Sequence, residues 1–451
     1  SSHFGSSSTL SDSSTSDTST NRKNAMAPSK LFKFTSVLLC VANGITLQTL
    51  GRLGSASDAH FAEFIKEHGR TYTEGSEEYE TRYALFQEHV VAVRAQNDRP
   101  DSLWSAGMNA LADRTPDELQ RLRGYRHGAK PNAVASSVGL VMTASRIANV
   151  HKLPKDFNYK HLKSMQQVLN QGGCGSCWAV SSATVLRAHA ELYQEDRTFS
   201  TQQILSCTPN PKKCGGSGGC GGATAELAMD YVARVGAITD DKLRYHASDD
   251  SCPSELQAAK QNLRSSNNQR MASFSEFSDA DGVSITGGGG AQFGMTGWKK
   301  LAENKAEPLL LALYEYGPVV VSVGASAPWN IYSSGIMGKC DKGVVINHAV
   351  ALVGYGEDSG SKYWTIQNSW GSSWGEGGFG RLLRLDDAEE NNYCGWDKSP
   401  ADGTACVGGP AKVWVCGNCG ILYDSVVPKF NLAKTGLLYT TGKRNITEES
   451  V

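Results

Sequence analysis

The sequence has no marked excess of charge of either sign and no apolar run long enough to cross a membrane. Its 44 lysine and arginine residues and 45 aspartate and glutamate residues leave a formal net charge of −1. A chain so close to neutral is not expected to have nucleic acid or an anionic membrane as its main partner. A membrane-spanning helix needs about 20 mostly apolar residues, and no stretch approaches that length.

Cysteine, in contrast, is abundant. Twelve cysteines among 451 residues are more than a cytosolic protein of this length usually carries, and they indicate an oxidising compartment. The length is sufficient for about three domains, or for two domains with extensions. We therefore expect a protein of the secretory pathway.

The amino-terminal region has the order of a targeting segment. Residues 1–25 are nearly all Ser, Thr, Asp and Asn and cannot bury a core. After Met26 come two lysines, then the mostly apolar stretch 34–42, then small residues at 54–57, which is typical of a secretory signal peptide. We expect translation to begin at Met26, with 1–25 as a disordered overhang and 26–57 as the signal peptide; the alternative is a disordered tail before a short signal anchor.

The segment 171–180 reads QGGCGSCWAV and contains the best candidate for a nucleophile. A glycine-rich turn leads to Cys177, which begins an apolar run typical of a buried helix. A thiol at a helix N-terminus lies at the positive end of the peptide dipoles, so its pKa is expected to fall and its thiolate to act as a nucleophile. Gln171 could donate to the resulting oxyanion together with the N–H of Cys177. A cysteine that only packs, and a redox dithiol of Cys174 and Cys177, are the alternatives.

With the preceding Gln-Gly and the following Trp178 included, this segment resembles the hallmark of the papain-like cysteine proteases. Two later segments agree with that resemblance: 347–350, which reads NHAV, and 368–371, which reads NSWG. The resemblance implies that His348 is the base for Cys177 and that Asn368 orients the imidazole, while Trp370 shields that hydrogen bond. Histidine suits both proton transfers because its ordinary pKa is about 6.5.

A helical segment before the peptidase resembles an inhibitory propeptide. Six residues recur at intervals of three and four and so share one face of a helix. They resemble the Glu-Arg-Phe-Asn-Ile-Asn signature of cathepsin L-type propeptides, with His and Val in place of the first Asn and of Ile. A second propeptide segment is similar to 107–113, with Leu for Phe. We expect a helical prodomain over 58–125, a linker over 126–150 and a maturation cut near His151. The six residues are Glu78, Arg82, Phe86, His89, Val93 and Asn97.

The chain is helical in its first half and rich in strand-like segments after Pro318, which indicates an α+β fold. The resemblance implies the papain-like two-lobe fold, with a helical left lobe, a β-barrel-like right lobe and the active-site cleft between them. We expect the peptidase domain over 151–400 and a cysteine-containing extension over 401–451. The segment between Cys252 and Pro318 is longer than the family norm. We interpret the excess as a surface insertion, because the glycine run at 287–290 is flexible and buries nothing. A phosphate loop is the alternative for four glycines, but no Lys-Ser/Thr follows them.

Three disulfides are implied by the resemblance: Cys174–Cys220, Cys207–Cys252 and Cys340–Cys394. Cys40 is lost with the signal peptide. The remaining four cysteines permit three pairings, and the sequence does not choose among them. Two of the four form a Cys-x-x-Cys step that could be half a zinc knuckle, although a disulfide suits a secreted chain better. No metal or cofactor is expected, and Asn445 is a possible glycosylation site. The four are Cys214, Cys406, Cys416 and Cys419.

The resemblance also places the residues that bind substrate. Small uncharged groups in the main specificity pocket suggest a roomy apolar site for the side chain two residues before the cut. Endopeptidase action is expected, because the chain lacks both a paired-histidine occluding loop and an insertion before Gln171. The substrate-binding positions are Gly222, Ala223, Ala225, Ser322, Trp370 and Ser399, with Ser399 at the base of the pocket and Ala223 replacing a glycine of the family.

Together these observations predict a papain-like cysteine endopeptidase that acts through a thiolate–imidazolium pair and a thioester acyl-enzyme. Its partners would be protein or peptide substrates and its own prodomain as an intramolecular inhibitor, in a monomer of the lysosome, vacuole or extracellular space. Acid would activate it by protonating prodomain carboxylates, with Glu78 and Asp113 as candidates. The alternatives are a thiol-disulfide oxidoreductase, a peptide ligase or acyl transferase on the same scaffold, and a non-catalytic homologue.

Overall fold

The computed structural model describes residues 60–124, 150–257, 282–284 and 289–431. The predicted overhang, signal peptide and glycosylation site lie outside these residues, as does the linker apart from its last residue. The chain divides into two compact units, 1–70 and 71–451. In the described part of the first unit, residues 60–67 are helical and the rings of Phe61 and Phe64 stack with centroids 6.2 Å apart. No helix among the described residues is both long and apolar enough for a bilayer.

The second unit begins with the helix that the sequence predicted for the prodomain. Helix α3 (Glu77–Asn97) starts at Ser76, whose side chain accepts a hydrogen bond from a first-turn N–H. Strand β1 (Trp104–Ala106) and helix α4 (Pro116–Leu122) follow. Arg82 of α3 forms an ion pair with Glu118 of α4 and donates to the carbonyl of Asp113 over 2.9 Å. These bonds join α3 to the first turn of α4 and to the segment just before it.

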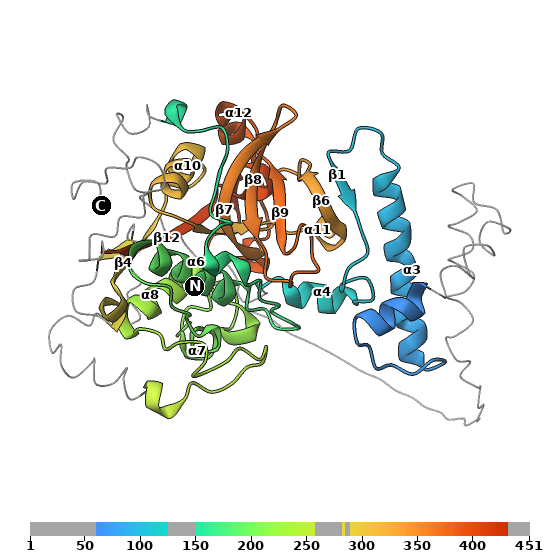
Figure 1. Cartoon of the computed structure of the whole chain (residues 1–451), viewed down its shortest axis with the longest axis horizontal. Helices are drawn as coiled ribbons and strands as arrows, with labels where there is room; N and C mark the ends of the chain where they lie inside the picture. The colour runs from blue at the N-terminus through green and yellow to red at the C-terminus, as the bar shows by residue number, and fades with distance from the viewer. Residues whose placement is uncertain (1–59, 125–149, 258–281, 285–288, 432–451) are drawn as a thin grey trace, which may run out of the picture. The chain divides into compact units, whose positions relative to one another are not determined.

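Three helices form the helical layer of the region predicted to be the peptidase (Figure 1). The long helix α6 (Cys177–Tyr193) is buried along most of its length, because its residues are small or apolar. Helix α7 (Thr201–Cys207) is capped by Ser200, and α8 (Ala225–Val235) ends at Gly236, which has the positive φ that glycine tolerates. The disulfides Cys174–Cys220 and Cys207–Cys252 tie the loops of this layer together, as expected.

A ten-stranded sheet forms the other layer, in the order β1-β6-β9-β8-β7-β5-β12-β4-β3, with β2 (Phe157–Asn158) paired to β7. Its two end strands do not pair, so the predicted barrel is an open sheet. The apolar strands β5 and β7 lie in its middle and are almost wholly buried. The other bounds are β3 (Gly282–Ser284), β4 (Met295–Lys300), β5 (Val319–Val323), β6 (Tyr332–Met337), β7 (His348–Asp358), β8 (Ser361–Gln367), β9 (Phe379–Leu383) and β12 (Asp424–Phe430), with helices α10 (Ala306–Glu315), α11 (Ala327–Ile331) and α12 (Asp387–Asn392) beside them.

The carboxyl-terminal boundary differs from the prediction. Strand β12 lies between β5 and β4, so the peptidase core continues to Phe430 and residues after 400 are not all an extension. The segment that leaves the core is instead the hairpin formed by β10 (Cys394–Asp397) and β11 (Val413–Cys416), together with the loop between them. The predicted bond Cys340–Cys394 is wrong. The structure has Cys340–Cys419, Cys394–Cys416 and Cys214–Cys406, which also excludes a zinc knuckle at Cys416 and Cys419.

The segment interpreted as a surface insertion is partly core. Gly289 and Gly290 are buried against the end of α8, where a Cβ on Gly289 would lie 2.1 Å from the carbonyl oxygen of Val235. Strand β4 then pairs with β12 and buries Trp298. These two glycines therefore permit close packing of backbone on backbone, rather than supplying a flexible surface run.

Candidate active site

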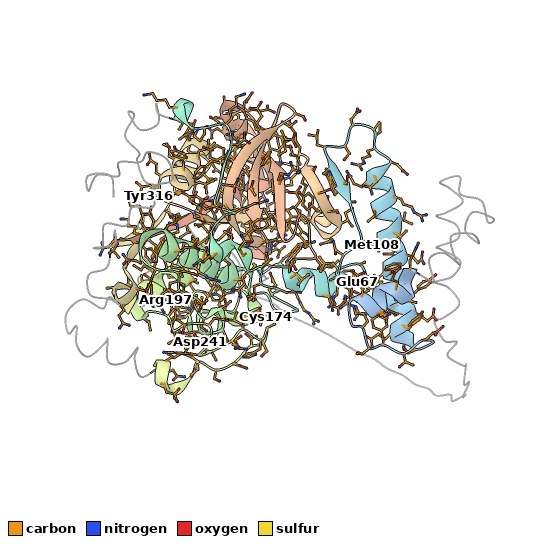
Figure 2. The ribbon with its side chains drawn as sticks, in the orientation of Figure 1. Glu67, Met108, Cys174, Arg197, Asp241 and Tyr316 are labelled. Carbon is orange, nitrogen blue, oxygen red and sulfur yellow. A yellow bond between two sulfur atoms is a disulfide. The ribbon has the colours of Figure 1, made fainter. Side chains whose placement is uncertain are left out.

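Cys177 is the first residue of α6 and has no solvent exposure. The turn before it bends at Gly172, whose φ is +64°. Cys174, labelled in Figure 2, is bonded to Cys220, which leaves Cys177 as the free cysteine among the described residues. The redox-dithiol interpretation is therefore wrong, because Cys174 is not available to Cys177.

The thiol of Cys177 is held in its neutral form. Burial raises its pKa to about 11, and backbone N–H groups oppose that rise only in part, among them the N–H of Ala349 at 3.4 Å from Sγ. The sequence predicted the opposite direction from the helix dipole. With the prodomain over the cleft, the loss of water outweighs the dipole.

His348 begins strand β7 and is fixed by Asn368. Its Nε2 donates to Oδ1 of Asn368 over 2.8 Å, and that oxygen also accepts from the N–H of Ser369. Nδ1 is buried and has no hydrogen-bond partner, so it is free to accept a proton. Burial, together with the charge of Arg123 from the prodomain, lowers the pKa of His348 to about 4, against the hydrogen bond with Asn368. The imidazole is therefore neutral while the prodomain is in place.

Aromatic rings surround the imidazole. The ring centroid of Trp370 lies 5.0 Å from that of His348, and the ring of Trp329 lies 6.1 Å away in an edge-to-face arrangement. Trp329 stacks in turn on Trp374. The sequence predicted the role of Trp370 but not that of Trp329, because no local motif marks it; its contact arises only when α11 packs beside β7.

Gln171 is fully buried, and its side-chain amide points at the prodomain. Nε2 donates to the carbonyl of Leu122 over 2.9 Å and to that of Cys174 over 2.8 Å. Its Oε1 accepts from the hydroxyl of Ser369, which fixes the orientation of the amide. A carbonyl oxygen of the prodomain thus takes the donor predicted for a substrate oxyanion.

The last described residue of the prodomain lies directly on the nucleophile. A Cβ on Gly124 would be 2.4 Å from Sγ of Cys177 and 2.8 Å from the carbonyl oxygen of Gly175. A Cβ on Gly222 would be 1.8 Å from the carbonyl oxygen of Gly124. Glycine is therefore required on both sides of this contact. Ala223, which replaces a glycine of the family, is buried and does not occupy the position that meets Gly124.

A cluster of charged residues lies beside the predicted specificity pocket. Ser322 donates to Asp424 over 2.6 Å, and Lys300 lies 3.1 Å from Asp424 and 3.4 Å from Glu226, the neighbour of Ala225. Burial and the charge of Asp424 raise the pKa of Glu226 to about 7, against the effect of Lys300. The wall predicted to be uncharged therefore has two carboxyl groups and one amine behind it.

Ser399 does not occupy the predicted position at the base of this pocket. It lies in the loop after β10, and its N–H donates to Asp397 over 2.8 Å. The residue that reaches Ser322 is Asp424 on β12. The prediction placed Ser399 there because Cys394 was taken for the cysteine that precedes the last core strand, a place that Cys419 holds.

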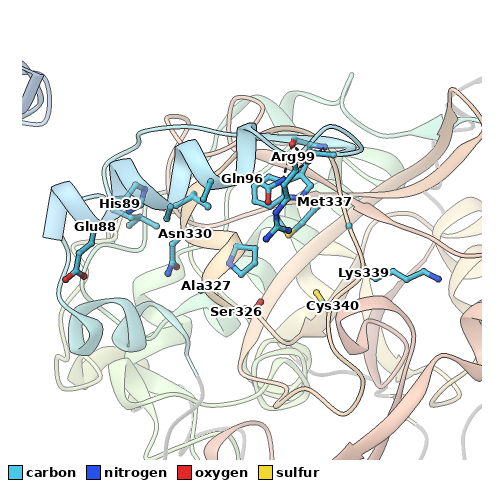
Figure 3. Close-up of a pocket in the computed structure, with 18 of the residues that line it drawn as sticks. Glu88, His89, Gln96, Arg99, Ser326, Ala327, Asn330, Met337, Lys339 and Cys340 are labelled. Atoms are coloured by element: carbon cyan, nitrogen blue, oxygen red, sulfur yellow. Dashed lines mark hydrogen bonds between the residues drawn. The ribbon is translucent and has the colours of Figure 1, made fainter. Parts of the chain in front are cut away.

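The prodomain is docked by one added strand. Strand β1 pairs antiparallel with β6, and the N–H of Gly107 donates to the carbonyl of Ile331 over 2.8 Å. Asn109 adds a bond of 2.8 Å from its amide to the carbonyl of Asn330. A groove of about 1400 Å³ runs between α3 and this part of the peptidase, and Figure 3 shows His89 and Asn330 on its opposite walls.

Sequence profiles of two known families match the chain. The sequence profile described as "Papain family cysteine protease" matches residues 153–404, and the one described as "Cathepsin propeptide inhibitor domain" matches residues 61–119. The first profile alone matches more than half of the chain.

Curated relatives agree with the two profiles. The oryzain beta chain of Oryza sativa subsp. japonica is 30% identical over 313 residues, which are 68% of this chain and 58% of that protein. Cathepsin K of Mus musculus is 29% identical over 347 residues, covering 75% of this chain and 90% of that protein. Among solved structures, digestive procathepsin L 3 of Tenebrio molitor superposes with a TM-score of 0.58 at 21% identity, covering 83% of this chain and 99% of that one. At 21% identity, the similarity to procathepsin L 3 shows a shared fold and nothing further.

Proposed function

Because the chain belongs to the papain family of cysteine proteases, we propose that Cys177 and His348 are its catalytic pair, with Asn368 orienting the imidazole and Gln171 binding the oxyanion. The protein is a cysteine-type endopeptidase made as a zymogen, since a cathepsin propeptide inhibitor domain precedes its peptidase. The observation that carries the assignment is the imidazole itself. Nε2 of His348 is committed to Asn368, while Nδ1 is unpartnered on the strand whose next N–H meets Sγ of Cys177.

In the proposed reaction, Nδ1 of His348 takes the proton of the thiol and the sulfur of Cys177 attacks the carbonyl carbon of the peptide bond. The oxyanion accepts hydrogen bonds from Nε2 of Gln171 and from the N–H of Cys177. The imidazolium then protonates the leaving amine as the C–N bond breaks, which leaves a thioester. A water molecule, deprotonated by His348, hydrolyses the thioester and restores the thiol.

Removal of the prodomain would change the charge state of the pair. With Gly124 and Leu122 gone, water reaches Cys177 and His348, so the desolvation that raises the thiol pKa and lowers the imidazole pKa is relieved. The charge of Arg123, which also disfavours the imidazolium, leaves with the prodomain. The helix dipole at the start of α6 can then favour the thiolate. The prodomain thus inhibits twice, by covering the site and by neutralising it.

The specificity pocket is proposed to lie between Ala225 on the helical side and Ser322 on the strand side. The carboxylate of Asp424 behind Ser322 disfavours the wholly apolar pocket expected from the sequence, because its charge must be balanced. In this structure the positive charge of Lys300 balances the carboxylate of Asp424. We therefore expect acceptance of both apolar and polar side chains two residues before the cut, with a preference controlled by the Lys300–Asp424 pair.

Five disulfides among the described residues suit an oxidising compartment. On this basis we assign the protein to the secretory pathway, with a lysosome, a vacuole or the extracellular space as its destination. Immunolocalisation of the tagged full chain would distinguish these three destinations, and a cytosolic location would contradict the assignment.

The catalytic assignment is tested with the full chain and its Cys177→Ser variant at mildly acidic pH with reductant. Mass spectrometry should show the wild type trimming itself near His151 and cutting a fluorogenic peptide, while the variant stays intact and inactive. A variant that retained activity would contradict the role of Cys177. If the wild type joined peptides instead of cutting them, product analysis would favour the ligase alternative.

A further inference from the structure

The loop between β10 and β11, residues 398–412, crosses from the strand layer to the helical layer, and we call it the strap. Its base is closed by Cys394–Cys416 and by four pairs of residues between the two short strands. The hairpin therefore leaves the core as a defined element rather than as a loose tail. The family resemblance did not predict the strap, and the last core strand begins only after it.

On the strand side the strap is anchored next to His348. Asp397, buried at the foot of the strap, accepts a hydrogen bond from the N–H of Ile346 over 3.4 Å. Gly403 is packed so closely that a Cβ there would lie 2.2 Å from the carbonyl oxygen of Ile346. Ile346 is two residues before His348, so this anchor lies close to the catalytic base.

On the helical side the strap is fastened covalently. Cys406 is bonded to Cys214, and two backbone hydrogen bonds flank the disulfide. The N–H of Gly215 donates to the carbonyl of Ala405 over 3.2 Å, and the N–H of Val407 donates to the carbonyl of Lys212 over 2.8 Å. The strap thus passes from Gly403 on one lobe to Ala405 on the other within two residues.

The loop that receives the strap borders the floor of the cleft. Asn210 holds this loop in shape by donating to the carbonyls of Cys214 and Gly216, over 2.8 Å and 3.0 Å. The carbonyl oxygen of Gly215 lies 2.3 Å from where a Cβ on Gly222 would be. Gly222 in turn meets Gly124, the prodomain residue that covers Cys177. Gly215 and Gly222 therefore connect the strap to the segment that occupies the cleft.

We propose that the strap closes the cleft just beyond Gly222 and limits how many substrate residues can lie on the amino side of the cut. This inference rests on the proposed function, in which the pocket beside Gly222 takes the side chain two residues before the cut. A substrate residue placed further toward its amino end meets the strap between Gly403 and Ala405. The enzyme still cuts inside a chain that can turn away at this point, but each extension across the strap lowers the rate.

The test uses the full chain, matured by removal of its prodomain, and a series of fluorogenic peptides. Each peptide carries leucine two residues before the cut and is extended toward its amino end by none to four alanines. The wild type should lose about tenfold or more in kcat/KM between the shortest and the longest peptide, because displacement of the reacting bond is costly. In a Cys214→Ser/Cys406→Ser variant the loss should shrink to about twofold. The reductant is kept low, and peptide mapping confirms that Cys214–Cys406 stays intact in the wild type.

A matched control removes a disulfide that does not cross the cleft. A Cys207→Ser/Cys252→Ser variant, which lacks a disulfide of the helical layer outside the strap, should keep the wild-type length dependence, so the effect is assigned to the bridge and not to lost stability. Equal rates for all lengths in the wild type would overturn the proposal, even if the variants failed to fold. Absence of cleavage of every peptide, including the shortest, would instead count against the proposed function.

Discussion

His89 should make release of the prodomain sensitive to pH. It lies on α3 where the family signature has asparagine, and its ring hydrogen-bonds to the backbone of Gly107 while Nε2 is buried without a partner. Gly107 itself donates to Ile331 of the peptidase. A proton on His89 would therefore place a charge at the joint between prodomain and peptidase. The charge of Asp113 would stabilise it. Glu88 and Arg99 line the same groove (Figure 3), as does Arg114.

The size of the effect follows from the pKa. Burial lowers the pKa of His89 from its ordinary 6.5 to about 4, against the hydrogen bond to Gly107 and the charge of Asp113. Between these values the unfolded prodomain binds more protons than the folded one, so its stability falls as the pH falls. At pH 5 the loss is about 2 kcal/mol, or about 30-fold in the equilibrium. The stability that neutral His89 gives the folded prodomain is complete above pH 6.5 and is fully lost only below pH 4.

The assay uses the full chain in a Cys177→Ala background, so that self-cleavage does not interfere. The rate at which an added acid-tolerant protease cuts the prodomain is measured from pH 7 to pH 4, with and without His89→Asn. The variant should lose the rise of about 15-fold between pH 6.5 and pH 5, whatever its rate at pH 7. His161→Asn, which changes an exposed histidine of the peptidase, should behave as the background. A pH profile unchanged by His89→Asn would refute this account.

Three further predictions concern the prodomain, the oxyanion site and the pocket. Burial raises the pKa of Glu118, but the bonds from Arg82 outweigh it and bring the pKa to about 2; its stabilisation is present above pH 4.5 and lost below. Glu118→Gln should therefore speed proteolysis of the prodomain at pH 7 and leave the slope between pH 6.5 and pH 4.5 unchanged, and an altered slope there would contradict the assignment. Gln171→Ala should lower kcat of the mature enzyme by about 100-fold or more with little change in KM, and a change confined to KM would exclude an oxyanion role. Lys300→Met should leave Asp424 unbalanced and raise kcat/KM for arginine over leucine two residues before the cut by about tenfold, since a close charge pair is worth at least that much when desolvated. An unchanged ratio would place Asp424 outside the pocket.

The parts of the site that lie in short contiguous segments could be predicted from the sequence. The turn before Cys177 and the segment that carries Asn368 each combine a functional residue with glycine or tryptophan, while the segment that carries His348 places it at the start of an apolar strand. The structure brings these segments together through the contacts of α6 with β7 and of His348 with Asn368. Local chemistry was sufficient there, because each segment's conformation depends mainly on its own residues.

The partner of Cys340 could not be chosen in the same way. Both Cys394 and Cys419 are followed by glycine, and either could precede the last strand. The choice depends on which later segment enters the sheet, and β12 does so because its buried face fits between β4 and β5. That choice depends on packing between segments that are far apart in the sequence. The wrong choice of cysteine also led to the prediction of Ser399, rather than Asp424, at the base of the pocket.

The residues that make the prodomain respond to acid also depend on the folded structure and could not be chosen from the sequence alone. The sequence favoured the carboxylates Glu78 and Asp113 as triggers, because paired carboxylates commonly control acid unfolding. In the structure Glu78 is 60% exposed where it pairs with Arg82 over 3.4 Å, and a carboxylate so open to water contributes little through such a pair. His89 was visible in the sequence only as a departure from the family's asparagine. Its importance depends on burial and on the contact with Gly107, neither of which the pattern of α3 reveals.

Gly124 connects inhibition with the shape of the cleft. The occupant of the site must lie flat between Cys177 and Gly222, since a single added methyl group would meet Sγ on one side and the carbonyl of Gly175 on the other. A prodomain that binds so closely excludes water from the catalytic pair, and that exclusion keeps the thiol and the imidazole neutral. The close fit of the prodomain therefore excludes water, and the same exclusion keeps Cys177 and His348 unreactive. Any change that loosens the contact at Gly124 should restore water and reactivity together.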